Sequence, residues 1–85
     1  MGLTLEQVSA LTRRVAADVA QDLRVVGITS SDGQGGRIEL LITVEGCHRD
    51  PCLVMVNVPR ADAPALEDAL RAQLPVLLRN HPPRP

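Results

Sequence analysis

Apolar residues recur at helical spacing along the first quarter of the chain. The stripe consists of Leu5, Val8, Leu11, Val15, Val19 and Leu23. Steps of three and four residues place these side chains on one face of a helix. Thr4 and Gln7 fit the T-x-x-Q capping box that starts a helix. The pattern predicts a helix over residues 4–22.

Strand-like patterns replace this spacing between residues 24 and 58. The runs are RVVGITS (24–30), RIELLITVE (37–45) and CLVMVNV (52–58). They are rich in β-branched residues, and the turn-forming segments SDGQGG and GCHRDP separate them. Because two short loops favour antiparallel neighbours, we expect a three-stranded meander with the third run at its edge.

Alternation along these runs sorts the side chains onto two faces of the sheet. The fully apolar face is predicted to contain Val26, Ile28, Ile38, Leu40, Ile42, Val44, Val54, Val56 and Val58. The other face is mixed, and an apolar patch is predicted there from Val25, Leu41, Leu53 and Met55. We expect helices to cover the first face and leave the second one open.

A second helix is predicted after Asp62, a favourable N-cap, with Leu66, Leu70 and Leu74 as its buried stripe. Pro75 lacks an N–H, so this helix should end or kink near Leu74. The predicted fold class is α+β, in the order α-β-β-β-α: a three-stranded antiparallel meander with two helices packed on one face. We expect a single domain over residues 1–80 and a disordered tail over residues 81–85.

Composition excludes several functions. The 85 residues include no Phe, Tyr or Trp, so there is no aromatic platform on which bases could stack. All nine basic residues are arginines spread along a chain of net charge −1, which does not predict a nucleic-acid partner. Double-stranded-RNA-binding domains share the α-β-β-β-α order, but the acidic ADAPALEDALR and the His-free SDGQGG lack their RNA-contacting motifs.

The chain also gives an expectation about its location. The segment MGLTLEQVSA has no basic stretch followed by an apolar run, as a secretion signal would have. No window approaches the ~18 apolar residues of a membrane span, so we expect no membrane partner. These features favour the cytoplasm, where the two cysteines are expected to be free thiols.

The motif GCHRDPC carries the most specific chemistry in the chain. Cys47, His48 and Cys52 are candidate metal ligands, with Asp50 as a further one. Their spacing lies at the edge of that of zinc sites, and His81 is the only other His or Cys available as a ligand. The sequence therefore predicts neither a metal nor another cofactor.

Two further interpretations of the cysteines stay open. If the apolar residues of two neighbouring strands share a face, the residue numbers of each opposed pair must add up to an even number. The numbers of Cys47 and Cys52 add up to an odd one, so these cysteines could form a disulfide only through a bulge or a loop excursion. A nucleophilic thiol with His48 as its base lacks an orienting acid. The simplest interpretation makes Asp50-Pro51 a turn and Cys52 a small apolar residue at the start of a strand. No catalytic residue is predicted.

The third strand is the strongest indication of function. CLVMVNV contains no charge, Gly or Pro, whereas exposed edge strands are usually blunted by such residues. We expect a non-enzymatic interaction or scaffold protein that forms a homodimer through this strand or the open face, or that binds another protein there. The segment PVLLRN could instead fold back over the edge. A thiol- or metal-dependent role is the alternative function, and a small molecule between helices and sheet stays open.

Overall fold

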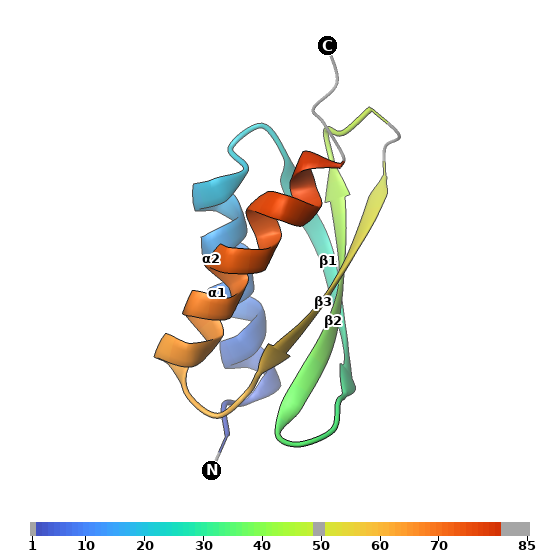
Figure 1. Cartoon of the computed structure of the whole chain (residues 1–85). Helices are drawn as coiled ribbons and strands as arrows, with labels where there is room; N and C mark the ends of the chain where they lie inside the picture. The colour runs from blue at the N-terminus through green and yellow to red at the C-terminus, as the bar shows by residue number, and fades with distance from the viewer. Residues whose placement is uncertain (1, 49–50, 81–85) are drawn as a thin grey trace.

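The computed structural model describes residues 2–48 and 51–80, and it confirms the predicted α+β fold. The elements are α1 (Leu5–Val19), β1 (Arg24–Asp32), β2 (Arg37–Glu45), β3 (Cys52–Pro59) and α2 (Ala63–Arg79). Both helices pack on one face of a single antiparallel sheet, and no described element covers the other face (Figure 1). No helix in the described part of the chain is long and apolar enough to cross a membrane.

The predicted capping box starts α1. The Gln7 N–H donates to Thr4 Oγ1 at 3.1 Å, and the Thr4 N–H donates to Gln7 Oε1 at 2.9 Å. Along the buried side, the Thr12 hydroxyl joins the apolar stripe because it donates to the Val8 carbonyl at 2.7 Å and so keeps its hydrogen bond. Leu5 is half exposed, so the buried stripe begins at Val8.

The start of α2 at the Asp62 cap is confirmed, but of the two outcomes predicted near Leu74, an end or a kink, the end is wrong. The helix continues through Pro75 to Arg79. The extra turn buries Leu78 against the core and half-buries Leu77. Burying such a side chain contributes about 1.5–3 kcal/mol, which offsets the ~3 kcal/mol cost of a proline inside a helix. The segment 75–80 therefore does not fold over the edge of the sheet.

The sheet has the strand order β1-β2-β3, so β3 is an edge strand as predicted. The β2–β3 ladder is regular from Arg37 opposite Pro59 to Val44 opposite Cys52. All the inward-pointing residues of these two strands are buried, as alternation predicts: Ile38, Leu40, Ile42, Val44, Cys52, Val54, Val56 and Val58.

A register shift in β1 reverses the prediction for two valines. The shift lies between Val25 and Gly27, and it places Val25 opposite Val44, packed against the core. Val26, predicted to be buried, is 42% exposed. A bulge adds one residue to a strand, so alternation on its two sides differs by one position. Val25 therefore does not belong to the open face.

Candidate functional site

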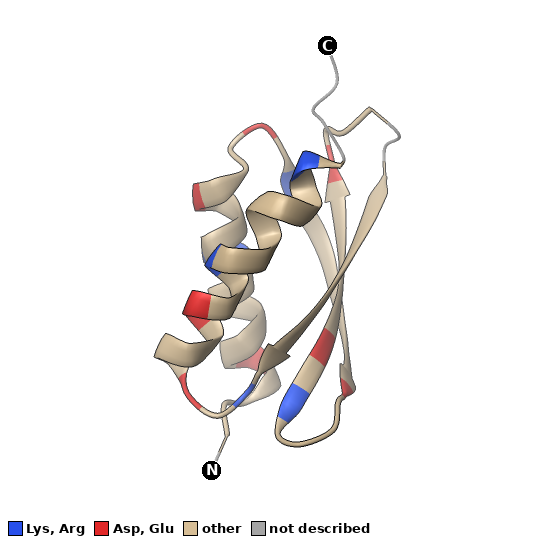
Figure 2. Cartoon of the chain, viewed as in Figure 1, with Lys and Arg blue, Asp and Glu red and all other residues tan. Residues whose placement is uncertain are grey.

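The open face of the sheet carries an exposed apolar patch on β2 and β3. Leu53 is 57% exposed and Met55 is 62% exposed. Met55 lies opposite the half-buried Leu41, and Leu53 lies opposite Thr43. Figure 2 shows that β3 carries no charged residue along its length, whereas charges flank it on β2 and after its end. We call Leu41, Leu53 and Met55 the open-face patch.

The outer edge of β3 also exposes main-chain groups. The Gly33 N–H donates to the Arg37 carbonyl on the β1 side of β2, and the Arg60 N–H donates to the Gly36 carbonyl on the β3 side. Because bonded and non-bonded pairs alternate in an antiparallel ladder, even-numbered residues of β3 bond to β2 and odd-numbered ones point outward. The outward groups are thus the N–H and C=O of Leu53, Met55 and Asn57, together with the C=O of Pro59, which has no N–H.

One outward group of this edge already has partners. The Asn57 carbonyl accepts from Gln73 Nε2 of α2 at 3.0 Å and from an Arg37 guanidinium N–H of β2 at 2.8 Å. The Arg37 guanidinium also donates to the Asn57 side chain. Side chains from both sides of the sheet therefore close the edge at Asn57, whereas no residue of 2–48 and 51–80 bonds to the outward main-chain groups of Leu53 and Met55. Asn57 is the polar exception in CLVMVNV, but nothing in the sequence pairs it with Gln73.

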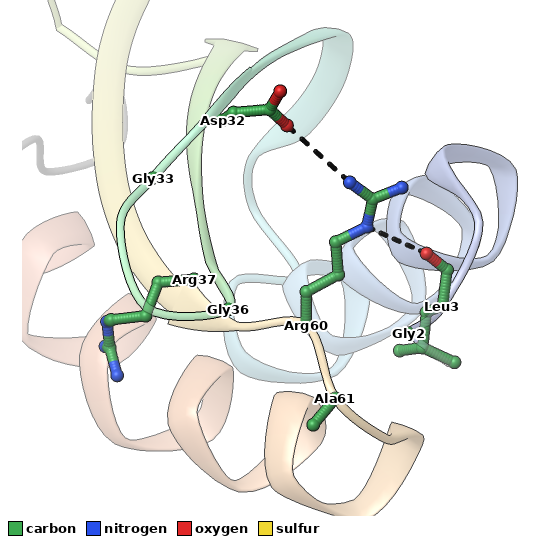
Figure 3. A pocket seen from close by; sticks show the side chains of 8 residues that line it. All are labelled: Gly2, Leu3, Asp32, Gly33, Gly36, Arg37, Arg60 and Ala61. Carbon is green, nitrogen blue, oxygen red and sulfur yellow. Dashed lines mark hydrogen bonds and ion pairs between the residues drawn. The ribbon is translucent and has the colours of Figure 1, made fainter.

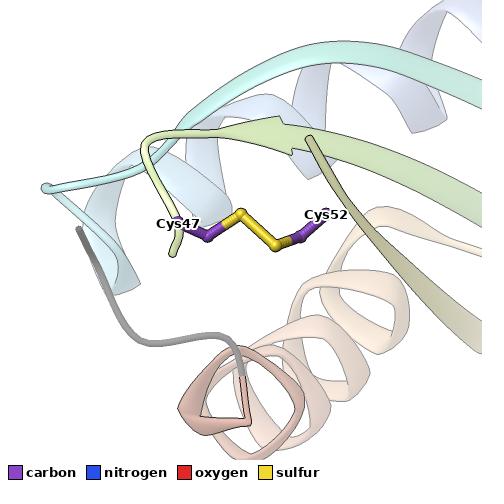
Figure 4. Close-up of a disulfide and its surroundings, with 2 residues drawn as sticks. All are labelled: Cys47 and Cys52. Atoms are coloured by element: carbon purple, nitrogen blue, oxygen red, sulfur yellow. A yellow bond between two sulfur atoms is a disulfide. The ribbon is translucent and has the colours of Figure 1, made fainter. Parts of the chain in front are cut away.

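The start of β3 is covalently anchored, which overturns the prediction of free thiols. Cys47 and Cys52 form a disulfide with a Cα–Cα distance of 6.5 Å (Figure 4). Both cysteines are buried as part of the core. The bond joins the segment after β2 to the first residue of β3, at the end of the sheet opposite Asn57.

Gly46 explains how Cys47 and Cys52 can meet although they cannot face each other in a regular ladder. The ladder ends where Val44 pairs with Cys52, so Cys47 lies beyond it. Gly46 has φ of 99°, and a Cβ at this position would lie 2.8 Å from the Asp22 carbonyl oxygen. Only glycine suits such a backbone conformation and so close an approach. The loop excursion at Gly46 turns Cys47 inward, which regular alternation did not predict.

The described candidate metal ligands, Cys47, His48 and Cys52, do not form a metal site. Among residues 2–48 and 51–80, no group of three His, Cys, Asp or Glu side chains is placed to hold an ion. The sulfurs of Cys47 and Cys52 bond to each other, so neither is a thiolate ligand, and His48 beside them is exposed. Asp50 and His81, the other candidate ligands, lie outside the described residues, as does the predicted tail 81–85.

A hollow of about 680 Å³ lies at the Asn57 end of the molecule, where Gly2, Leu3, Asp32 and Arg60 meet (Figure 3). Arg60 Nε donates to the Leu3 carbonyl at 2.8 Å, and its guanidinium lies 3.7 Å from the Asp32 carboxylate. This arginine ties the N-terminal segment to β1 and to the end of β3.

Charged side chains on the helices serve to join them. Arg71 of α2 contacts Glu67 at 2.9 Å and Asp18 of α1 at 3.0 Å. Hydrogen bonds from its guanidinium to Glu67 and then to Asp18 raise the pKa of Arg71 above its ordinary value. The cluster is an interhelical clamp on the far side of the molecule from the open-face patch.

Fold and surface together define a small α+β domain whose antiparallel sheet has one uncovered face and one uncharged edge. No family model, no curated protein and no solved structure matches this chain. Its function is therefore inferred from the surface alone.

Proposed function

We propose that this protein is a non-enzymatic interaction domain that self-associates through β3 and the open-face patch. The observation that carries this proposal is the outer edge at Leu53 and Met55. Their side chains are more than half exposed, and their main-chain groups point away from β2. Soluble proteins usually protect such an edge with charges, bulges or a covering segment.

A homodimer is the simplest assembly that covers this edge, because two-fold pairs are the commonest oligomers. The disulfide supports this role by fixing the first residue of β3 against the core. A partner strand would therefore meet a pre-ordered template, which lowers the entropic cost of association. The thiol- or metal-dependent alternative gains no support, because both sulfurs are consumed in the disulfide.

The cytoplasmic location expected from the sequence stays a prediction, and the disulfide argues against it. Disulfides persist in oxidising compartments and are rare in the cytoplasm. Acid trapping of thiols at cell lysis, followed by intact-mass measurement, decides between the two. We expect the trapped protein to take up no alkylating reagent; two added alkyl groups would place it in a reducing compartment.

Native mass spectrometry and sedimentation velocity test the proposed self-association. The wild type should be dimeric, and Met55→Asp should be monomeric with an unchanged circular dichroism spectrum. Thr29→Asp is the matched control, because Thr29 flanks Leu41 from β1 as Met55 flanks it from β3. A wild type that stays monomeric at high concentration, or a Met55→Asp variant that dimerises normally, contradicts the proposal.

A further inference from the structure

We infer that two copies pair β3 against β3 in one particular antiparallel register, in which Leu53 of each copy lies opposite Met55 of the other. This inference rests on the proposed self-association and adds its geometry. The two-fold axis then passes beside Val54, and two three-stranded sheets become one of six strands.

The main-chain groups of the edge match this register. Leu53 and Met55 both point their N–H and C=O outward, so each Leu53 exchanges two hydrogen bonds with the partner's Met55. Every outward group of these two residues then has a partner. Since an unpaired main-chain group costs free energy when it is buried, a register that pairs all of them is preferred.

The flanking residues match as well. In this register, Asn57 lies opposite Pro51 of the partner, the exposed residue directly before β3. Pro51 has no N–H to donate, but the Asn57 carbonyl needs none, because Gln73 and Arg37 already supply its hydrogen bonds. The Asn57 N–H remains, and the carbonyl of Pro51 can accept from it.

The neighbouring registers lack this match. If Met55 pairs with Met55 of the partner, the Leu53 N–H meets the Asn57 carbonyl, which already accepts two hydrogen bonds. If Leu53 pairs with Leu53 of the partner, Met55 lies opposite Pro51, and its carbonyl receives no donor. Each alternative therefore leaves one main-chain group per copy without a suitable partner.

Side chains and charge point to a second copy as the occupant of this edge. Leu41 and Met55 are already neighbours, and the register places the partner's Leu53 on the other side of Met55. The two open-face patches thus merge across the axis. In a two-fold pair, a charged residue near the axis lies close to the same residue of the partner, and the like charges repel each other. β3 carries no charge, so it avoids this repulsion.

A direct test is an isotope-filtered nuclear Overhauser experiment on a dimer mixed from labelled and unlabelled wild-type protein. Because the Val54 N–H faces β2, its Hα points outward, and two non-bonded partners have Cα atoms about 4.5 Å apart. We expect a contact between Val54 Hα and Val54 Hα of the partner. A contact from Val54 to Cys52 or Val56 of the partner overturns the register but keeps the proposed function.

A pair of variants tests the main-chain bonds. Leu53→Pro removes an outward N–H without touching the ladder to β2, whereas Leu53→Ala shortens the same side chain and keeps the N–H. We expect Leu53→Pro to dimerise roughly 10- to 100-fold more weakly than Leu53→Ala, because the symmetric dimer loses two hydrogen bonds. Equal dimerisation by two folded variants overturns strand pairing.

The remaining outcomes separate the inference from the proposed function. A dimer without contacts between the two β3 strands, but with methyl contacts from Met55, overturns strand pairing and leaves association through the open face. A protein that stays monomeric in every measurement overturns both the register and the proposed self-association. If Leu53→Pro does not fold, the nuclear Overhauser experiment on wild-type protein still tests whether the two β3 strands pair and in which register.

Discussion

The two edges of the sheet are protected in different ways. β1 contains a register shift after Val25, an exposed Arg24 paired with Glu45 and an Asp32 at its end. Arg13 of α1 also donates to the outward Val25 carbonyl at 3.2 Å. β3 has a regular register and no charge, and within the described part of the chain its only side-chain cap is at Asn57. Bulges and charges are the usual means of preventing strand pairing, and only β1 has them.

The difference follows from what each strand packs against. Every second residue of β3 is buried, and α2 packs against this strand. A bulge in β3 would turn one of these residues outward, whereas β1 has shallower burial and tolerates one. Of the two edge strands, the one that contributes more to the core is therefore the one that stays regular and able to pair.

The largest contrast between the edges should appear in hydrogen exchange. Amides of Leu53 and Met55 point outward from β3, and by the same alternation those of Ile28 and Ser30 point outward from β1. We expect exchange at Leu53 and Met55 to slow by roughly 100-fold or more between dilute and concentrated protein, as pairing protects them. Exchange at Ile28 and Ser30 should not change, and equal slowing at both edges would mean that β1 pairs too.

Reducing the disulfide should have the next largest effect, because it removes an anchor that only β3 has. The bridged cysteines are five positions apart, and closing so short a loop contributes about 2 kcal/mol. We expect the reduced protein, compared with the oxidised one in urea, to lose about that much free energy of unfolding. In exchange measurements, the Val54 amide, which bonds to β2, should lose more protection than the Leu41 amide, which bonds to β1; equal losses would show that the anchor acts on the whole domain.

The sequence predicted the regular strands well and the irregular one poorly. Strict alternation is enough to assign every inward residue within β2 and β3 themselves. In β1, the apolar pair Val25 and Val26 fits either face, and the choice depends on where the bulge lies. Alternation cannot locate an inserted residue, so the assignment was reversed.

The remaining errors share a cause: tertiary contacts outweighed a sound local rule. Pro75 is a reliable helix terminator only where nothing beyond it is buried, and Leu78 is buried. Alternation excludes a bridge between Cys47 and Cys52 only if both lie in a regular ladder. The chain turns at Gly46, so Cys47 lies outside the ladder. The apolar members of the candidate surface were visible in the sequence, but the cap on Asn57 was not, because Gln73 lies on another element.

The side-chain caps of the two edges should contribute similar amounts to the free energy of unfolding, and less than the disulfide does. Gln73→Ala removes a donor from the Asn57 carbonyl, and Arg13→Ala removes one from the Val25 carbonyl. Each change should lower the free energy of unfolding by about 0.5–1 kcal/mol, measured by urea denaturation at a protein concentration where the chain is monomeric. A loss at Gln73 several times larger than that at Arg13 would mean that Asn57 is a structural centre as well as a cap.

The smallest effect is expected at the bulge itself. Val26 is 42% exposed, so Val26→Thr gains a hydroxyl that water can solvate, and the free energy of unfolding should change by less than about 0.5 kcal/mol. The matched control, Val56→Thr, places the same hydroxyl at a fully buried position on β3 and should cost about 1–3 kcal/mol. Urea denaturation of both variants checks the pair. Equal costs would show that Val26 is buried after all, and the bulge that distinguishes the two edges would have to lie elsewhere.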